Sequence, residues 1–278
     1  MKHALSPKTI FSRIIIYSFL ILLAFFFLAP VYAMVVSSLK PFAEVSVFTM
    51  WELPKSLHLS NFTEAFETLK PHFGNSIYLV IPATILSAFI GSINGYVFSK
   101  WKFKYSKFLF WLIVMGMFLP FQSILLPMVQ VLQKLRVYNT IPGLILVHVV
   151  YGIPITTLMF KNFYTSTPQA MIESAKIDRA GFWRIYIHIV FPLSLPAFMV
   201  VFIWQFTNIW NEFLFAIIVT SAGKQPIMVA LQNMSGSQVV EWNVTMAGAL
   251  IAAAPTVLVY LVAGKYFVKG LLAGSIKE

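Results

Sequence analysis

The sequence contains no cysteine, few acidic residues and no phosphate-binding loop. Without cysteine, disulfides, thiolate zinc sites and cysteine nucleophiles are excluded. No Gly-x-x-x-x-Gly-Lys-Ser/Thr segment occurs, so the chain does not bind ATP through a P-loop of its own. The sequence does not show the clustered His, Asp and Glu residues of a metal centre or a catalytic triad. It therefore gives no support to an enzyme. We therefore expect no catalytic residue, no metal and no cofactor bound by this chain.

Charged residues make up only 10% of the chain, hydrophobic residues make up 59%, and the mean hydropathy is +0.82. This much apolar surface exceeds what one soluble core can bury, so the composition predicts a polytopic membrane protein. A helical span needs about 20 apolar residues. Six stretches in one all-α membrane domain over residues 1–278 meet this length: 14–36, 76–98, 108–132, 141–160, 189–220 and 244–264.

The first apolar run, Ile14 to Val36, is 23 residues long. It exceeds the roughly 7 to 15 residues of a signal-peptide core, so we interpret it as the first span.

Lysine and arginine are distributed unevenly between the predicted loops. With the N-terminus in the cytoplasm, 14 of the 20 basic residues fall on the cytoplasmic side, and this distribution predicts that both termini are cytoplasmic. The net charge of +11 is then a consequence of topology and gives no support to nucleic-acid binding. The longest outer segment, 37–75, includes Asn61–Phe66, which is predicted to form a short surface helix.

The second span carries a small residue at every fourth position: Ala83, Ser87, Gly91, Gly95 and Ser99. Such a stripe allows close approach of another helix, and we favour a helix of this chain over one of a partner subunit. Eight prolines lie in the predicted spans, where they are expected to kink helices or to allow them to move.

Polar residues line one face of the fifth span. Gln205, Asn208 and Glu212 are spaced by three and four residues, with Asn211 beside Glu212 and Trp204 beside Gln205. A carboxylate is costly inside a membrane, so this face should meet water or protein. Two interpretations remain open, a lining for a hydroxylated solute and hydrogen bonding between helices. Single polar residues elsewhere are expected to make packing contacts: Asn94, Gln122, His148 and Thr156.

The predicted cytoplasmic segment between spans four and five, residues 168–192, has a helix–turn–helix pattern. Thr167 is a plausible N-cap for a first helix that contains Glu173, and a second segment with Phe182 and Trp183 follows Gly181. An amphipathic pair of this kind lies either on the lipid interface or in the groove of a partner.

Within that segment, Glu173-Ser174-Ala175, then Gly181, then Ile189-x-Phe191-Pro192 resembles the EAA loop of the permease subunits of binding-protein-dependent ABC importers. The tail, 266–277, is similar to that of the second permease of carbohydrate importers. Three further segments, 94–96, 147–152 and 204–211, look most like permeases for glucose and mannose.

The resemblance implies a multi-pass subunit of a prokaryotic inner membrane that pairs with a second permease above two ATP-binding subunits, which carry the ATP and Mg. Glu173, Ser174, Ala175, Asp178, Arg179, Gly181, Phe182 and Trp183 would then couple to the ATPase. The substrate pathway would include Trp204, Gln205, Asn208, Asn211 and Glu212. Segment 221–243 would reach an extracytoplasmic sugar-binding protein, residues 273–278 would approach the ATPase interface, and lipid would cover the outside.

One position departs from the family pattern. Arg179 stands six residues after Glu173, where the family usually has glycine in a left-handed turn. A residue with a side chain pays about 1 kcal/mol for that conformation. Either Gly181 takes over the turn, or Arg179 points at an acidic group of the ATPase.

The resemblance predicts import of glucose or mannose. The alternatives are a glucosyl disaccharide, a maltose-type sugar or a glucosylated osmolyte. An ion-coupled secondary transporter is an alternative of another class, supported only by the intramembrane acid Glu212.

Overall fold

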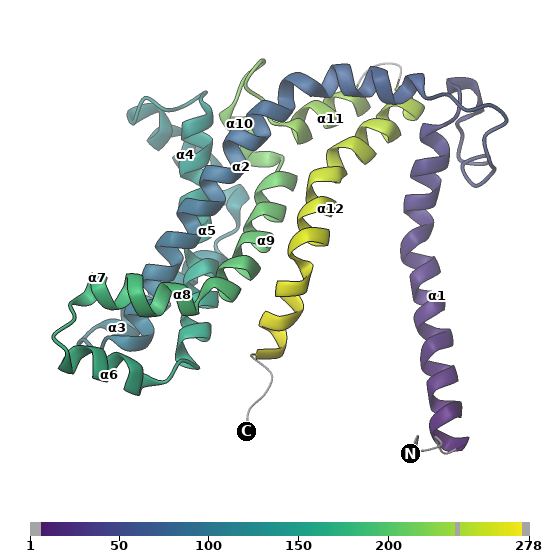
Figure 1. Ribbon diagram of the computed structural model, residues 1–278. Helices are drawn as coiled ribbons and strands as arrows, with labels where there is room; N and C mark the ends of the chain where they lie inside the picture. Colours follow the sequence, from purple (N-terminus) through teal and green to yellow (C-terminus); the bar gives the residue numbers. More distant parts are fainter. Residues whose placement is uncertain (1–6, 237–239, 274–278) are drawn as a thin grey trace. The chain divides into compact units, whose positions relative to one another are not determined.

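The computed structural model describes residues 7–236 and 240–273, with side chains described for 10–236 and 240–264. The described residues form helices and contain no strand, which confirms the all-α prediction (Figure 1). In chain order the elements are α1 (Pro7–Ser38), η1 (Phe42–Glu44), α2 (Ser60–Lys100), α3 (Ser106–Met115), η2 (Gly116–Phe118), α4 (Phe121–Lys134), α5 (Ile141–Thr165), α6 (Gln169–Ile177), α7 (Phe182–Ile185), η3 (Tyr186–Val190), α8 (Phe191–Leu193), α9 (Leu195–Asn211), α10 (Leu214–Val219), α11 (Ile227–Ser235) and α12 (Trp242–Ala273).

Four helices of the described chain are long and apolar enough to cross a membrane: α1, α2, α5 and α12. Two further candidates are bent pairs. The first joins Ser106–Phe118 to Phe121–Lys134 at 104°, and the second joins Phe182–Leu193 to Leu195–Asn211 at 74°. The predicted six spans are reached if each bent pair counts as one span.

Two of the predicted spans are therefore broken. The stretch 108–132 is interrupted before Pro120, whose extended backbone (ψ 119°) precedes α4. Proline lacks an N–H and disfavours helix at the residue before it, which accounts for the break. The stretch 189–220 is interrupted at Ser194. After this break α9 continues to Asn211, and Glu212 has an extended backbone (ψ 127°) before α10 begins.

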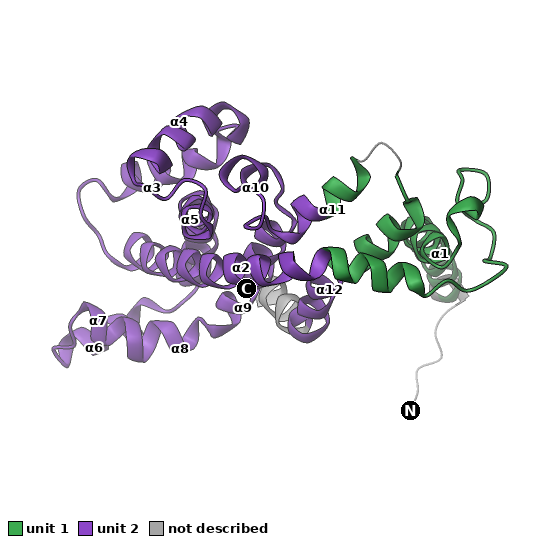
Figure 2. Ribbon diagram, turned by 90° about the horizontal axis from the view of Figure 1, so that it is seen from above, with its two compact units in different colours: residues 1–68, 231–252 green, residues 69–230, 253–278 purple. Residues whose placement is uncertain are grey.

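The chain divides into two compact units, shown in different colours in Figure 2. Unit 1 comprises residues 1–68 and 231–252. Its packed cluster consists of Ala65, Val244 and Ala247, and the Asn61 amide donates to the carbonyls of Ser38 and Lys40 at 2.9 and 2.8 Å.

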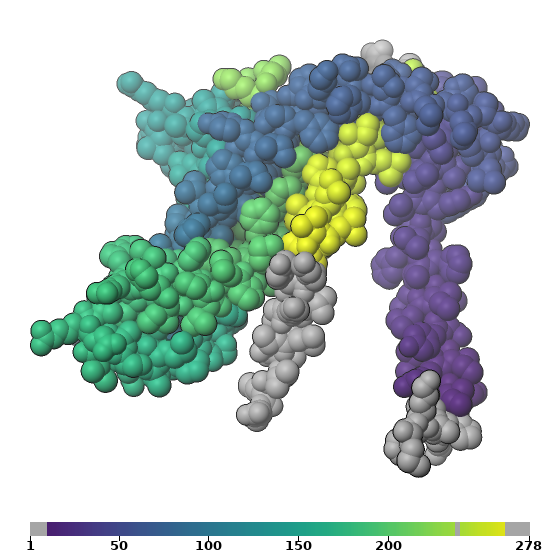
Figure 3. Space-filling model, in the orientation of Figure 1, coloured from purple at the N-terminus to yellow at the C-terminus, as the bar shows by residue number. Residues whose placement is uncertain are grey.

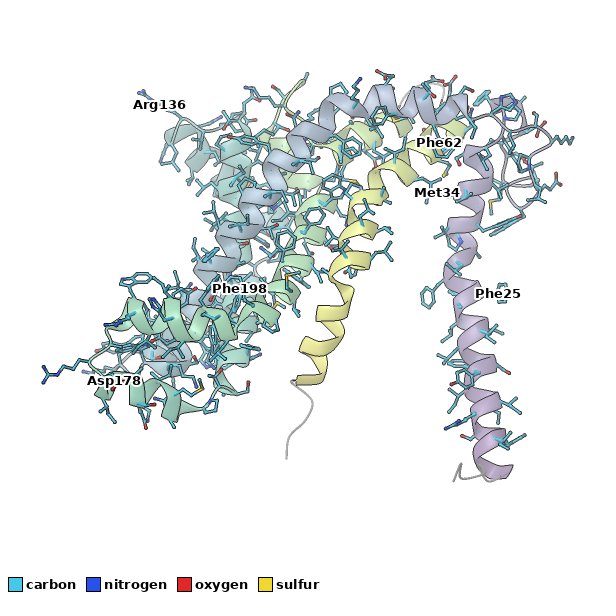
Figure 4. The ribbon with its side chains drawn as sticks, in the orientation of Figure 1. Phe25, Met34, Phe62, Arg136, Asp178 and Phe198 are labelled. Carbon is cyan, nitrogen blue, oxygen red and sulfur yellow. The ribbon has the colours of Figure 1, made fainter. Side chains whose placement is uncertain are left out.

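Within unit 1, the predicted short helix at Asn61–Phe66 exists, but it forms the first turns of α2. The apolar window of α1 has no buried residue, and Phe25, labelled in Figure 4, is 74% exposed. The space-filling view shows the side chains of α1, in purple, projecting from the helix (Figure 3).

Unit 2 comprises residues 69–230 and 253–278 and is built around α2, α5 and α9. The small-residue stripe of α2 lies against α5 of the same chain. A Cβ atom at Gly95 would lie 2.7 Å from the backbone N of Lys161, and one at Gly91 would overlap Thr156. Ala83 and Ser87 are fully buried. The stripe therefore packs within this subunit, as predicted.

Candidate functional site

The helix–turn–helix is formed by α6 and α7, which lie together at one end of unit 2 (Figures 1 and 4). Arg179 itself adopts the left-handed conformation, with φ 56°. The N–H of Arg179 donates to the carbonyl of Lys176, and that of Ala180 donates to the carbonyl of Ala175, both at 3.0 Å. These two bonds make a Schellman motif that ends α6 with a side chain at the position that usually carries glycine.

The two expected alternatives at this turn are thereby decided in part. Gly181 does not take over the turn, because its φ is −73° and its ψ is 170°.

The predicted N-cap was wrong: α6 begins at Gln169 after Pro168, and no side chain caps it. Instead, the carbonyl of Thr167 accepts a bond of 2.6 Å from the ammonium of Lys100, at the end of α2.

The helix α6 has two different faces. Ile172 and Ala175 are buried in the core cluster that joins α6 and α7 to α2, α5 and α9, so the side chain of Ala175 packs within this subunit. The opposite face and the turn are exposed, with Ile177 82% and Trp183 58% accessible. The predicted coupling residues on the exposed side are Glu173, Ser174, Asp178, Arg179, Gly181 and Trp183, and Phe182 is half-buried.

Buried hydroxyl groups connect the loop to two long helices. The Ser92 hydroxyl of α2 lies 2.6 Å from Tyr164 Oη of α5 and 2.9 Å from Tyr186 Oη, in the π-helical turn η3 that follows α7. The ammonium of Lys176 lies 4.2 Å from the ring centre of Trp101, a cation–π distance. These side-chain contacts therefore hold the loop against α2 and α5.

The polar face of the fifth span borders a cavity of about 220 Å³ within unit 2. Helices α4, α5, α9 and α10 contribute to its walls. The lining residues are Phe121, His148, Tyr151, Gly152, Ile155, Trp204, Gln205, Asn208, Ile209, Glu212 and Phe215.

His148 and Glu212 meet at this cavity, with Nε2 of the imidazole 3.7 Å from Oε2 of the carboxylate. His148 is 6% exposed, and its Nε2 has no hydrogen-bond partner among the described residues. The expectation that His148 makes a satisfied packing contact is therefore wrong. Its neighbour in space, Glu212, follows the end of α9, and helical spacing along one segment does not reveal such a pair.

The other predicted pathway residues have different surroundings. The amide of Gln205 donates to Ser87 Oγ at 2.8 Å, which is hydrogen bonding between helices. Asn208 and Trp204 border the cavity, and the Asn208 amide donates to the carbonyl of Trp204 at 2.8 Å. Asn211 is exposed, bonds to the Thr207 carbonyl at 2.9 Å and does not line the cavity.

Sequence reasoning missed the aromatic wall formed by Phe121, Tyr151 and Phe215. Ring centres of Tyr151 and Phe215 lie 5.4 Å apart, and those of Phe121 and Phe215 lie 5.7 Å apart. Two of the missed lining residues, His148 and Tyr151, lie within 147–152, the segment that resembles sugar permeases.

No group of three His, Cys, Asp or Glu residues that could hold a metal ion occurs in the described part of the chain.

Two of the predicted contact segments lie partly outside the described residues: 237–239 of the predicted outer loop and 274–278 of the predicted ATPase contact.

Residues 83–272 match the family model described as the binding-protein-dependent transport system inner membrane component. The chain belongs to this family. The matched region includes the helix–turn–helix and every residue that lines the cavity.

Three relatives illustrate the likeness. A probable ABC transporter permease of Pyrococcus horikoshii is 49% identical over 63% of this chain and 64% of its own length. The xylose/arabinose import permease XacI of Haloferax volcanii is 31% identical over 93% of this chain and 92% of its own. The glucose import permease GlcU of Saccharolobus solfataricus is 29% identical over 92% of each. The prediction of a carbohydrate ABC importer permease is confirmed.

Solved structures support the fold. A chain of a bacterial ABC transporter that imports alginate, an acidic polysaccharide, superposes with a TM-score of 0.79 at 18% identity, covering 95% of this chain and 99% of that chain. A chain from the bacterial alginate transporter in complex with its pentasaccharide-bound periplasmic protein gives a TM-score of 0.67 at 15% identity, covering 92% of this chain and 94% of that chain.

Proposed function

We propose that this permease forms half of an alternating-access pathway for a sugar and transmits ATP-driven movement to it through the α6–α7 loop. The observation that carries the proposal is the two-faced loop. One face of α6 is anchored in the core of unit 2, while Glu173 on its other face, Asp178 in the turn and Trp183 on α7 are exposed. An exposed, rigid and partly aromatic surface of this kind suits the groove of a partner protein.

The chain connects this loop directly to the cavity. After α7 the backbone passes through η3 and α8, bends at Ser194 and continues as α9, which carries Trp204, Asn208 and, at its end, Glu212. A π-helical turn and a proline-flanked bend are sites where helices deform readily. Movement of the loop would therefore shift one wall of the cavity, and binding of ATP by the partner would select between two states.

The coupling role is tested with Glu173→Lys in the assembled transporter. Reversal of the charge on the exposed face should either prevent co-purification of the ATPase subunits or uncouple ATP hydrolysis from uptake. Glu64→Lys, at another exposed carboxylate, on α2, is the matched control. Normal uptake together with normal ATPase binding by the Glu173 variant would contradict the assignment.

The proposed partners are a second permease subunit, two ATP-binding subunits and an extracytoplasmic sugar-binding protein, in a prokaryotic inner membrane. The likeness to the alginate transporter that was solved with its periplasmic protein supports the last partner. Co-expression with genes for candidate partner subunits and purification through a tag on this chain should recover all of the subunits in a stoichiometric complex.

Glucose or mannose is the proposed substrate, with a glucosyl disaccharide, a maltose-type sugar or a glucosylated osmolyte as alternatives. The glucose permease GlcU and the pentose permease XacI support the sugar class without separating its members. Uptake into proteoliposomes across a panel of labelled sugars, with and without ATP, identifies the substrate.

The pair of His148 and Glu212 is the one observation that favours an ion-coupled transporter, because titratable pairs inside spans serve proton relays. Uptake that a protonophore abolishes and ATP depletion leaves intact would support that function and would overturn the ATP-driven one.

A further inference from the structure

We propose that the cavity is a subsite for one uncharged sugar ring, in which His148 and Glu212 share a single hydroxyl group of that ring. The proposal rests on the transport function proposed above and names the chemistry that this subunit itself recognises.

The distance between the two side chains fits a bridging hydroxyl group. Nε2 of His148 and Oε2 of Glu212 are 3.7 Å apart, which is too far for a direct hydrogen bond. A ligand oxygen could lie within hydrogen-bond distance of both atoms once the side chains move slightly apart, because Nε2 of His148 is buried and without a hydrogen-bond partner among the described residues. A hydroxyl group accepts from the imidazole N–H and donates to the carboxylate with the same oxygen. An ammonium group cannot accept, and a carboxylate cannot donate.

The carboxylate of Glu212 is held in place before any ligand binds. Its Oε1 accepts the N–H of Phe215 at 2.7 Å, and its Oε2 accepts the N–H of Ala216 at 3.2 Å. A carboxylate oxygen has lone pairs for further donors, so Oε2 is able to accept a ligand hydroxyl as well. An ionised carboxylate in a confined site repels an anionic ring, so we expect the cavity to select neutral sugars over uronic acids.

The remaining walls provide apolar contact for the faces of a ring. Aromatic surfaces come from Phe121, Phe215 and Trp204. The hydroxyl group of Tyr151 donates a hydrogen bond of 2.8 Å to the Leu119 carbonyl. The cavity volume of about 220 Å³ lies below the range of about 300–1,000 Å³ that is usual for drug-sized ligands. The space thus suits one ring of a sugar.

The absence of cysteine from this chain allows a direct test. Asn208→Cys places one thiol at the cavity wall, and Gln122→Cys places a control thiol on the exposed surface of α4 outside the cavity. Each variant is assembled into the complete transporter in proteoliposomes with its binding protein and ATP. Modification by a small maleimide is followed on this chain by mass spectrometry, in the presence of D-glucose, D-mannose, maltose or D-glucuronate.

The sugar that supports ATP-driven uptake should slow labelling at position 208 by about fivefold or more and leave position 122 unchanged, whereas D-glucuronate should protect neither. Protection by D-glucuronate equal to that by the neutral sugar would overturn the proposed charge selection. Unprotected labelling at position 208 during active uptake would overturn the subsite itself.

The shared hydroxyl is tested in the Asn208→Cys background with Glu212→Gln and His148→Gln. Glutamine weakens the bond to the hydroxyl at position 212, because a neutral amide replaces the carboxylate, and at position 148 it replaces a fixed imidazole N–H, so protection should shift to sugar concentrations higher by on the order of tenfold. Glu64→Gln makes the same chemical change on an exposed part of α2 and should leave protection unaltered. ATPase co-purification and basal ATP hydrolysis report whether each variant folds. Folded variants with unchanged protection would contradict the proposed roles.

These outcomes separate the subsite from the transport function. If the unsubstituted complex shows no ATP-driven uptake of any sugar in the panel, the proposed function is wrong and the subsite falls with it. If uptake is normal and position 208 is never protected, only the subsite is wrong.

Discussion

The backbone N–H of Ala180 donates to the carbonyl of Ala175 at 3.0 Å and closes the end of α6, although the left-handed residue between them, Arg179, is not glycine. The turn that the family builds with glycine is therefore retained, with strain in the backbone of one arginine. Because that strain persists, the arginine side chain is expected to have a use of its own at this position.

Arg179→Gly should relieve the strain and stabilise the subunit by about 1 kcal/mol. Arg179→Ala removes the charge and keeps the strain, so it is the matched control. Thermal unfolding of the purified complex measures the first effect, and ATPase co-purification measures the role of the side chain. If both variants lose the ATPase, the guanidinium contacts it. A lower unfolding temperature for the glycine variant would contradict the turn assignment.

Gly95→Ala should destabilise the subunit by about 1–3 kcal/mol, because the added Cβ would lie 2.7 Å from the backbone of α5. Gly74→Ala lies on the same helix and meets no atom within 4 Å. It should be neutral or stabilising by up to about 1 kcal/mol through helix propensity. Unfolding temperatures of the two variants compare the effects directly. Equal behaviour of both variants would argue against the close approach of α2 and α5.

Ser92→Ala should cost about 1–3 kcal/mol, since it removes the hydroxyl that the buried Tyr164 and Tyr186 share. Ser99→Ala removes a hydroxyl of the same helix that bonds only to the Tyr96 carbonyl among the described contacts, and it should cost less. We also expect Ser92→Ala to lower uptake per ATP hydrolysed, because the shared hydroxyl ties the loop to α2 and α5. An unchanged coupling ratio would assign Ser92 to stability alone.

The predicted topology is testable with single thiols at two exposed lysines. Lys134→Cys at the end of α4 is predicted to lie outside, and Lys104→Cys before α3 is predicted to lie in the cytoplasm. A membrane-impermeant maleimide should label position 134 in intact spheroplasts and position 104 only after permeabilisation. The reverse pattern would invert the orientation.

Much of the molecule could be predicted from local properties of the sequence. Span length depends on runs of apolar residues, which accounts for α1, α5 and α12. The helix–turn–helix depends on residues close together in the chain, and its segment resembled a known loop. Span continuity was harder to predict, because proline is tolerated inside a helix at Pro127 and Pro154 but ends one at Pro120. A proline is tolerated inside a span where neighbouring groups satisfy the freed backbone carbonyl, and the local sequence pattern does not contain those neighbours.

The sequence by itself determined that this chain is a helical membrane permease without a P-loop of its own, and it predicted a cytoplasmic coupling loop, because hydropathy and short motifs are local. Only the tertiary structure decided which polar groups act together. It separated Gln205, bound to Ser87, from Glu212, which lies beside His148 at the cavity. Contacts between helices depend on packing angles and on where each helix breaks, and neither is encoded in the spacing of residues along one segment.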